Sequence, residues 1–342
     1  MAVTIRDVAA LAGVSPSTVS RTCKDHSSIS KETKEKVRWA MAQLGYEPNP
    51  ASSVPSGQNS PLIGIILPPS SGEVFENSFY LEAIRGISQF CNDREYVSTV
   101  ITGRDADEIL KAIRTLVKDE RIGGFIVLYS REEDPVIDYL YSEGLLYVLI
   151  GKAQQFANQT IYVDNDNLLT GKEVTEYLYR LGHRRIAYVS SSDMMFSSER
   201  KAGYQLALMQ NELPIRAEYC VEIAGNLVED NEALRSLLLQ EERPTAVVAS
   251  DDILAVELER ACAQMGISIP DDLSIISFNN SLLSRITSPQ LTSVDINSCQ
   301  LGIEAASQLI NHVENPNLLA TKIIVPHTLI VRGSCREIKA DR

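Results

Sequence analysis

Three side chains on a short predicted helix near the N-terminus have chemistry suited to nucleic acid. Pro16, Ser17 and Arg21 fall on the outward face of this helix, whereas Val19 turns inward. When such a helix lies in the major groove of DNA, side chains near its start meet the edges of the bases. The hydroxyl and the guanidinium can both donate hydrogen bonds there, so the pattern favours contact with DNA.

Two helices and a tight turn are predicted to position these side chains. Thr4 followed by Asp7 is a capping box that starts the first helix, and Gly13 supplies the left-handed backbone that ends it. Ser15-Pro16 then starts a second helix with a capping hydroxyl and a proline at the first helical position. A third helix is expected from about Ser30. The pattern predicts a helix-turn-helix module, with an ordinary helical hairpin as the alternative.

The charge of the chain is unevenly distributed. Residues 1–60 hold seven basic and five acidic side chains, a net charge of +2, although the whole chain carries −13. Positive charge is therefore confined to one end of an acidic protein. Because a module of charge +2 should bind DNA weakly as one copy, we expect a homodimer that presents two copies to two half-sites.

Composition argues against several classes of protein. The chain has no apolar run long enough to span a membrane and no N-terminal secretion signal, so a cytoplasmic location is expected. Six cysteines are spread singly without a C-x-x-C pair, which argues against zinc. Pro68-Pro69 stands where a dinucleotide-binding glycine motif would follow the first strand, and neither a phosphate-binding loop nor a Gly-x-Ser-x-Gly motif is present. We therefore expect no enzyme activity, no metal and no cofactor.

Beyond residue 61 the sequence alternates between strand-like and helix-like segments. A linker rich in proline and serine, EPNPASSVPSGQNSP, precedes them at residues 47–61. The strand-like runs are Leu62–Leu67, Val97–Thr102, Gly124–Tyr129, Leu145–Ile150, Arg185–Val189, Thr245–Ala249 and Leu273–Phe278, and the helix-like segments are Tyr80–Phe90, Asp107–Val117, Leu168–Leu181 and Ile253–Met265. This alternation predicts an α/β body with parallel sheets and helices on both faces, arranged as two lobes with a ligand site between them.

Polar side chains follow the predicted strands, where open parallel sheets bind their ligands. They are Ser70, Ser71, Tyr129, Lys152, Asp164, Asn165, Ser190 to Ser192, Asp251, Asp252, Asn279 and Asn280. Together they predict a site rich in hydroxyl groups and of mixed charge.

Several segments resemble the lactose/galactose repressor family over essentially the whole chain. They are the helix-turn-helix, Tyr46-Glu-Pro-Asn49, Leu62–Pro68, Asn77–Ile87, Val163-Asp-Asn165 and Pro289–Val294. Within that family, Leu128–Pro135, Leu149–Lys152, Val163–Asn167 and Val294–Ser298 are most similar to the maltose-operon repressors of Gram-positive bacteria.

The resemblance implies a sugar-responsive repressor that binds a palindromic operator as a homodimer. It implies a DNA-binding headpiece at residues 1–48, a hinge at 49–61, and a two-lobed body at 62–342 that is similar to periplasmic sugar-binding proteins. The N-lobe would comprise about 62–162 plus 292–322, and the C-lobe about 163–291 plus 323–342. The tail after Val331 is too short for a coiled coil, so a dimer rather than a tetramer is expected.

The resemblance also implies which residues contact DNA. Pro16, Ser17 and Arg21 match base-reading positions, and Arg21 can hold guanine through two hydrogen bonds. Thr4, Thr18, Ser20, Ser30 and Asn49 match positions that contact the DNA backbone. In the hinge, relatives wedge a leucine into the minor groove, whereas this chain has Pro55 at that place. Either Pro55 or the neighbouring Val54 acts as the wedge, or the operator is bent less than in relatives.

The effector positions of the family fall on Asp164, Arg200, Ser250, Asp251 and Asn279, with Tyr129 as a further candidate. Arginine and carboxylate groups can bind neighbouring sugar hydroxyls in pairs, and an aromatic ring can cover the apolar face of the sugar. The candidates for that cover are Phe79, Tyr129, Phe156 and Phe196. Asn279 departs from the aspartate usual in the family, which leaves the identity of the sugar open.

The implied effector is maltose or a maltodextrin, which would bind between the lobes and alter the spacing of the two headpieces. Alternatives are a non-sugar ligand or a phosphorylated partner protein as the regulator. A secreted sugar-binding protein and a sugar-active enzyme fit the sequence less well.

Overall fold

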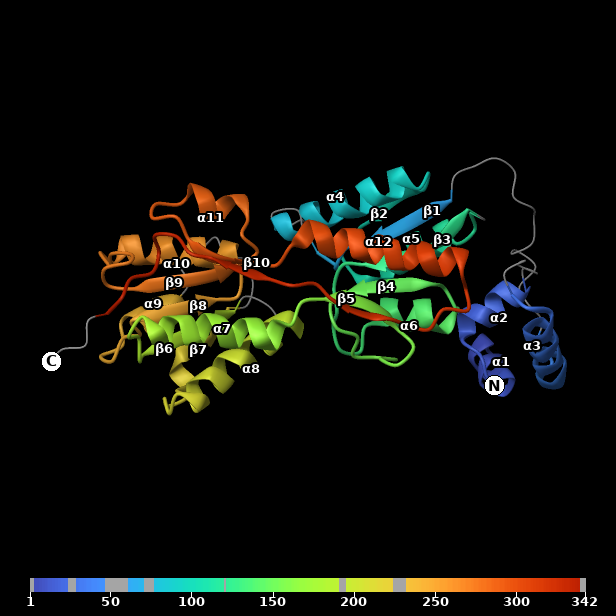
Figure 1. The fold of residues 1–342 in the computed structure, drawn as a ribbon, viewed down its shortest axis with the longest axis horizontal. Coiled ribbons are helices and arrows are strands. Elements are labelled where there is room, and N and C mark those ends of the chain that lie inside the picture. Colours follow the sequence, from blue (N-terminus) through green and yellow to red (C-terminus); the bar gives the residue numbers. More distant parts are fainter. Residues whose placement is uncertain are drawn as a thin grey trace. The chain divides into compact units, whose positions relative to one another are not determined.

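The computed structural model describes residues 3–23, 29–46, 61–70, 77–119, 121–190, 195–223 and 232–338 (Figure 1). The chain divides into two compact units. Unit 1 comprises Met1–Glu76, Tyr80–Asp164 and Cys299–Ile323, and unit 2 comprises Asn77–Phe79, Asn165–Ser298 and Ile324–Arg342. Several residues of the sequence predictions lie outside the described residues. They are Asn49, Val54 and Pro55, on which the hinge predictions depend, and Ser71, Ser191 and Ser192.

The first three helices form the predicted helix-turn-helix with its third helix. They are α1 (Ile5–Ala12), α2 (Pro16–Cys23) and α3 (Lys31–Leu44). Thr4 and Asp7 make the capping box, and Gly13 ends α1 with φ 67°. The small core contains Ile5, Val8, Ala9, Val19, Val37 and Ala40. Because both helix ends and the buried stripe agree with the sequence, the prediction of this module is confirmed.

Unit 1 contains a six-stranded sheet in the order β11-β5-β4-β3-β1-β2. Its strands are β1 (Leu62–Ile66), β2 (Val97–Ile101), β3 (Ile122–Val127), β4 (Tyr147–Ile150), β5 (Ile161–Asp164) and β11 (Lys322–Ile324). Strands β1 to β5 are parallel neighbours. The helices are α4 (Ser78–Asp93), α5 (Ala106–Leu116), α6 (Pro135–Ser142) and α12 (Ser298–Glu314). Strands β1 and β4 are buried throughout, as expected for parallel strands covered by helices.

Unit 2 repeats this plan with the order β12-β10-β9-β8-β6-β7. Its strands are β6 (Ile186–Ser190), β7 (Cys220–Glu222), β8 (Ala246–Ala249), β9 (Ser274–Phe278), β10 (Thr292–Asp295) and β12 (Thr328–Ile330). Only β12 is antiparallel to its neighbour among the strand pairs with a described register. The helices are α7 (Asn167–Arg180), α8 (Met195–Gln210), α9 (Glu232–Leu238), α10 (Asp252–Gln264) and α11 (Leu282–Ile286), with a short 3-10 helix at Ala217–Tyr219.

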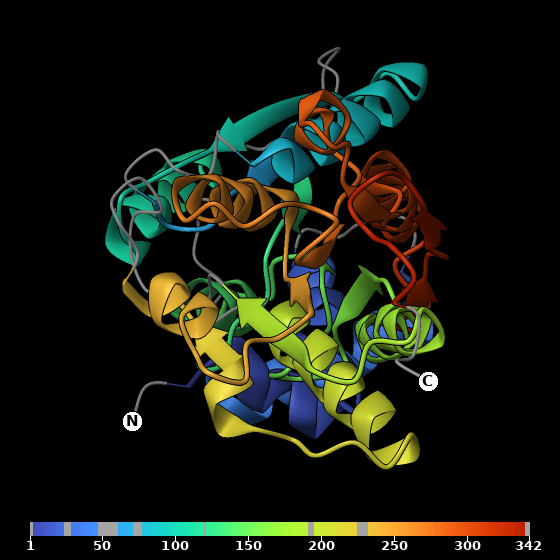
Figure 2. The same cartoon turned by 90° about the vertical axis from the view of Figure 1, so that its left-hand side faces the viewer.

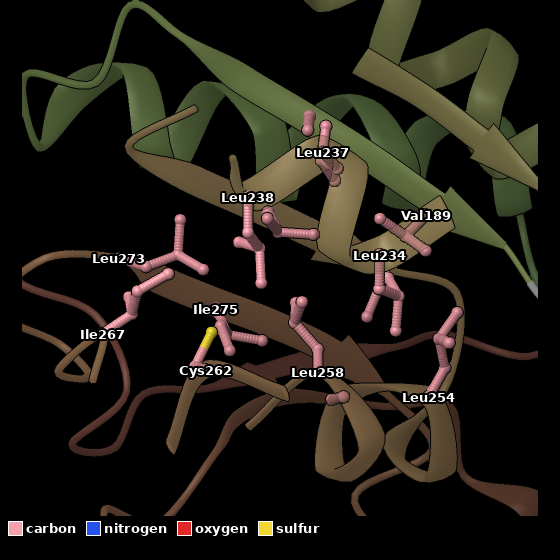
Figure 3. Close-up of a cluster of buried hydrophobic side chains, with 14 of the residues drawn as sticks. Val189, Leu234, Leu237, Leu238, Leu254, Leu258, Cys262, Ile267, Leu273 and Ile275 are labelled. Atoms are coloured by element: carbon pink, nitrogen blue, oxygen red, sulfur yellow. The ribbon is translucent and has the colours of Figure 1, made fainter. Parts of the chain in front are cut away.

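Helices cover both faces of the second sheet. Figure 2 shows α9 and α10 on one side of that sheet and α7 and α8 on the other. Leucines of α9 and α10 pack on one face of the strands in the cluster of Figure 3, where Leu237 and Leu258 are almost fully buried. A second cluster, which includes Val174 of α7 and Tyr204 of α8, covers the opposite face. The doubly covered α/β architecture predicted from the alternating pattern is therefore present in each unit.

Apart from the short segment Asn77–Phe79, which belongs to unit 2, the chain passes between the units at three places. They are Asp164/Asn165, Ser298/Cys299 and Ile323/Ile324. The second passage lies later than the expected position near residue 292, because β10 pairs in parallel with β9 and so belongs to the second sheet. Among the described helices, none is long and apolar enough to cross a membrane.

Candidate DNA interface and effector site

The start of each DNA-binding helix is fixed by side-chain hydrogen bonds. Both the backbone amide and the hydroxyl of Thr4 donate to the Asp7 carboxylate at 2.8 Å, which lowers the pKa of Asp7. The Ser15 hydroxyl accepts from the Thr18 amide at 3.2 Å and so caps α2. On α3, Ser30 caps the helix by accepting from the Thr33 amide. These caps fix where each of the three helices begins.

The structure supports some of the expected DNA contacts better than others. Thr4 and Ser30 are exposed, and Ser17, Ser20 and Arg21 are partly exposed. Partial burial lowers the pKa of Arg21 to about 10, so its guanidinium remains positively charged at neutral pH. The Thr18 side chain is buried and bonded to Ser15, which leaves it poorly placed to reach phosphate.

The expectation that Pro16 points outward is wrong for this structure. Pro16 is buried, and its carbonyl oxygen would lie 2.8 Å from a Cβ atom added at Gly144. Nearby, Arg6 donates from Nη2 to the Ser142 hydroxyl at 2.7 Å and lies over the Tyr141 ring at 4.6 Å. The absence of a side chain at Gly144 therefore permits the close approach at Pro16. No motif in the sequence predicted this role for Arg6.

Unit 1 contributes Tyr129 and Asp164 to the expected effector set. Tyr129 follows β3, is buried, and donates from its hydroxyl to Asp134 at 3.4 Å. Burial raises the pKa of Tyr129 strongly, so the hydroxyl stays protonated. Asp134 also accepts from the Val136 and Ile137 amides, because it caps α6. Asp164 ends β5 and is buried. Lys152 is exposed after β4, and Ser70 is partly buried after β1.

Phe156, a predicted cover for the sugar, stacks on another aromatic side chain. Its ring stacks on Tyr141 with the centroids 3.7 Å apart and the planes within 3°. The Arg6 guanidinium carbon also lies 5.1 Å from the centroid of this ring, so Phe156 is already engaged by side chains of unit 1. Phe79 also packs against a hydrophobic core, that of unit 2.

Unit 2 places Arg200 at the centre of its polar group. The side chain lies on α8 and is only 2% exposed. Its Nε donates to the Asn167 side-chain oxygen at 3.0 Å, and its Nη1 donates to the Ser250 carbonyl oxygen at 2.8 Å. The guanidinium carbon lies 4.2 Å from the centroid of the Phe278 ring and 4.8 Å from that of Phe196. The structure therefore brings together Arg200, Ser250 and Phe196, as expected, and adds Asn167 and Phe278.

Ser250 is notable because its side chain is fully buried. Its hydroxyl oxygen has no hydrogen-bond partner among the described residues. Asp251, the next residue, caps α10 by accepting from the Leu254 amide at 2.8 Å. A buried hydroxyl without a partner is energetically costly, and such groups commonly mark a place where water or a ligand binds.

Some polar residues that follow strands serve the fold instead. The Asp252 carboxylate accepts from the Ser277 and Ser293 hydroxyls and from the Ser281 amide, all within 2.7 Å. Asn165 donates to the carbonyl oxygens of Ile296 and Val325. These residues hold neighbouring segments of unit 2 together, so their prediction as ligand contacts is not supported.

Asn279 and Asn280 occupy strained backbone at the end of β9. Their φ angles are 97° and 46°, in the region that asparagine tolerates better than most residues. The Asn280 side chain donates to Asp295 and accepts from Arg332. Asn279 is partly buried, and its backbone amide donates to the Val294 carbonyl. The turn therefore fixes the backbone of both residues, and the Asn280 side chain stabilises the fold through its two hydrogen bonds.

Comparison with known proteins identifies the family. Residues 4–49 match the model for bacterial regulatory proteins of the lacI family, and residues 175–335 match a periplasmic binding protein-like domain. The HTH-type transcriptional regulator MalR of Streptococcus pneumoniae is 33% identical over 339 residues, which cover 96% of this chain and 99% of the relative. This chain belongs to the LacI family. MalR of Staphylococcus xylosus is also 33% identical, over 98% of this chain and 99% of the relative.

Solved structures of LacI-family proteins agree with this assignment. A putative transcriptional regulator LacI from Bacillus cereus subsp. cytotoxis has 38% identity and a TM-score of 0.78, covering 82% of this chain and all of that chain. A structure described as a transcriptional regulator CelR-cellobiose complex has 26% identity and a TM-score of 0.76, covering 97% of this chain and all of that chain. The LacI-family protein described here is thus a DNA-binding transcriptional regulator and not an enzyme.

Two residues of the polar group around Arg200 were not predicted from the sequence. Asn167 lies at the start of α7, in a segment quoted only for its resemblance, and Phe278 lies inside a buried strand. Phe278 could not be predicted as a site residue, because an aromatic residue in a buried strand is normally part of the hydrophobic core. Asp166, the preceding residue, already caps α7, so the side chain of Asn167 is not needed to cap the helix. A second polar side chain beside a complete cap was the one feature of the sequence that could have indicated another role for Asn167.

Proposed function

We propose that this regulator represses sugar-utilisation genes as a homodimer whose affinity for a palindromic operator is controlled by a small sugar, maltose or a maltodextrin. The capped helix-turn-helix supports the operator-binding part of this proposal, with Ser17 and Arg21 as base contacts. Exposed Thr4 and Ser30 and partly exposed Ser20 are the proposed contacts with the DNA backbone.

The observation that carries the sugar proposal is the buried Ser250 hydroxyl beside Arg200. Arg200 donates hydrogen bonds to oxygens of Asn167 and Ser250, and its guanidinium carbon lies 4.8 and 4.2 Å from the ring centroids of Phe196 and Phe278. A hydroxyl-bearing ligand would give the Ser250 hydroxyl the partner that it lacks among the described residues. The two MalR relatives and the complex of CelR with cellobiose support a glucose disaccharide rather than a charged ligand.

The coupling required between sugar and operator is modest. We propose that the sugar contacts Arg200, Ser250 and Asp251 in unit 2 and so favours one arrangement of the headpieces. A 100-fold change in operator affinity corresponds to about 2.7 kcal/mol of coupling free energy. Differential contacts of one ligand with two conformations can supply that amount.

The test is titration of maltose and maltotriose into the complex of the regulator with operator DNA at fixed salt. We expect the sugar to change the operator affinity of the wild type, and Ser250→Ala to need at least about tenfold more sugar for the same change. Without sugar, Ser250→Ala should bind the operator normally and be up to about 1 kcal/mol more stable, because an unpaired buried hydroxyl is removed.

Ser268→Ala is the matched control, because Ser268 is an exposed serine elsewhere in unit 2. It should leave both the sugar response and the stability unchanged. If neither sugar alters operator affinity in the wild type, the sugar proposal is wrong, and a non-sugar ligand or a phosphorylated partner protein becomes the better regulator.

A further inference from the structure

Asn167 contacts Arg200 but is not among the proposed sugar contacts. It is the first residue of α7, and its side chain is only 2% exposed. The helix start is capped by Asp166, whose side chain accepts from the Leu169 amide at 2.9 Å. Asn167 instead turns its side-chain oxygen toward α8, where it accepts from Nε of Arg200.

The backbones of α7 and α8 approach unusually closely just beyond this contact. A Cβ atom added at Gly171 would collide with the Arg200 carbonyl, and one added at Gly203 would collide with the Leu168 carbonyl. Gly171 lies one helical turn after Asn167, on the same face of α7. The two glycines therefore fix where the backbone of Arg200 lies relative to Asn167, and both helices can be followed in Figures 1 and 2.

The contacts of the guanidinium fix its plane as well as its position. Asn167 accepts along the Nε edge, while the Ser250 carbonyl accepts from Nη1. The rings of Phe278 and Phe196 lie against the group at 4.2 and 4.8 Å. A planar donor held at two edges has a defined direction for its remaining N–H bonds. Loss of the Asn167 contact would remove the acceptor on the Nε edge and so loosen the orientation of the guanidinium plane.

We propose that Asn167 is a positioning residue for the effector site: it orients the Arg200 guanidinium toward the sugar without contacting the sugar itself. This inference rests on the proposed role of Arg200 in sugar binding. A preorganised guanidinium loses less conformational entropy on binding, so removing Asn167 weakens the sugar complex although every direct sugar contact is retained.

The first test compares Asn167→Ala with Asn167→Asp by calorimetric titration of maltose into the full-length protein. Alanine removes the acceptor and should weaken maltose binding about tenfold, whereas aspartate keeps an oxygen at the same place and should stay within about threefold of the wild type. In an Arg200→Lys background, Asn167→Ala should have at most a twofold effect, because the Nε–H donor is then absent.

Asn211→Ala is the matched control. Asn211 is a partly buried asparagine of unit 2 that donates to the Ala207 carbonyl at 2.8 Å, so its removal also deletes one side-chain hydrogen bond. It should lower thermal stability by an amount similar to Asn167→Ala and leave maltose affinity unchanged. Equal loss of affinity in both variants, or in both Asn167→Ala and Asn167→Asp, would show that the role of Asn167 is merely structural.

A second measurement does not depend on the identity of the effector. Crystal structures of the sugar-free wild type and Asn167→Ala should show Arg200 ordered in the first and displaced or in several rotamers in the second. An unchanged Arg200 in Asn167→Ala would overturn the proposal. Failure of the wild type to bind maltose would instead count against the proposed effector and leave this structural comparison decisive.

Discussion

At the scale of single residues, burial decides which polar groups serve the fold. His183 is 1% exposed, with Nδ1 2.9 Å from the Thr245 hydroxyl and Nε2 3.2 Å from the Arg336 carbonyl oxygen. A neutral imidazole protonated on Nε2 satisfies both, since the carbonyl only accepts and the hydroxyl can donate. Burial accordingly lowers the pKa of His183 to about 4.

This shift predicts a loss of stability in acid. The unfolded chain binds a proton at His183 near pH 6.5, whereas the folded protein binds it only near pH 4. The contribution of His183 to the free energy of unfolding is therefore fully present above about pH 6.5. It falls as the pH drops toward 4, by up to about 3 kcal/mol. Urea unfolding at several pH values should show a steeper loss in the wild type than in His183→Gln. If the stability of both proteins falls equally with pH, the buried imidazole is not the cause of the acid sensitivity.

At the scale of elements, the glycine between α1 and α2 ends one helix and allows the next to begin. Gly13 has φ 67°, and no atom lies within 4 Å of a Cβ added there. A substitution is therefore opposed by backbone strain and not by a collision. Trp39 on α3 is the only tryptophan of the chain and is 55% exposed, as expected for a residue off the buried face.

Gly13→Ala should destabilise the helix-turn-helix by about 1 kcal/mol, because alanine is strained in the left-handed region. Gly13→Asn should cost less, since asparagine tolerates that region better. Thermal unfolding of the full chain, followed by Trp39 emission, measures this module. Gly266→Ala, with φ 69° and equally open surroundings in unit 2, is the control and should not move the Trp39 transition. A shift of equal size in both variants would contradict the local explanation.

At the scale of the whole molecule, exposed apolar side chains are candidate contacts of the proposed homodimer. In unit 1, Leu81 of α4 and Val97 of β2 are 53% and 49% exposed. In unit 2, Leu282 and Ile286 lie four residues apart on α11 and are 62% and 65% exposed. Covering such faces with a second copy would bury apolar area and give the weakly basic headpiece a second contact with DNA.

We therefore predict that Leu282→Asp combined with Ile286→Asp converts a dimer into monomers and weakens operator binding at least about 100-fold. Sedimentation velocity measures the first effect and operator titration the second. Leu319→Asp is the control, because Leu319 is 86% exposed outside these elements. A wild type that sediments as a stable tetramer, or a double variant that stays dimeric, would contradict this assignment.

Local sequence signals accounted for much of the fold. The caps at Thr4 and Ser15, the turn at Gly13 and the alternation of strands and helices are determined by neighbouring residues, so they could be read directly. Strands such as β7, β11 and β12 are only three residues long and partly exposed, which leaves no periodic pattern to recognise. The assignment of β10 to the second sheet depended on its pairing with β9.

The sequence by itself determined the helix-turn-helix and the two-lobed α/β plan and predicted Arg200 as an effector contact, because each follows from local spacing or from family resemblance. Only the tertiary structure decided that the Asp252 carboxylate accepts hydrogen bonds that stabilise the fold and that the Ser250 hydroxyl is buried. It also decided that Asn167 accepts a hydrogen bond from Arg200. These outcomes depend on contacts between residues 25 or more positions apart, and hydrogen-bond partners at such separations leave no pattern in a single sequence.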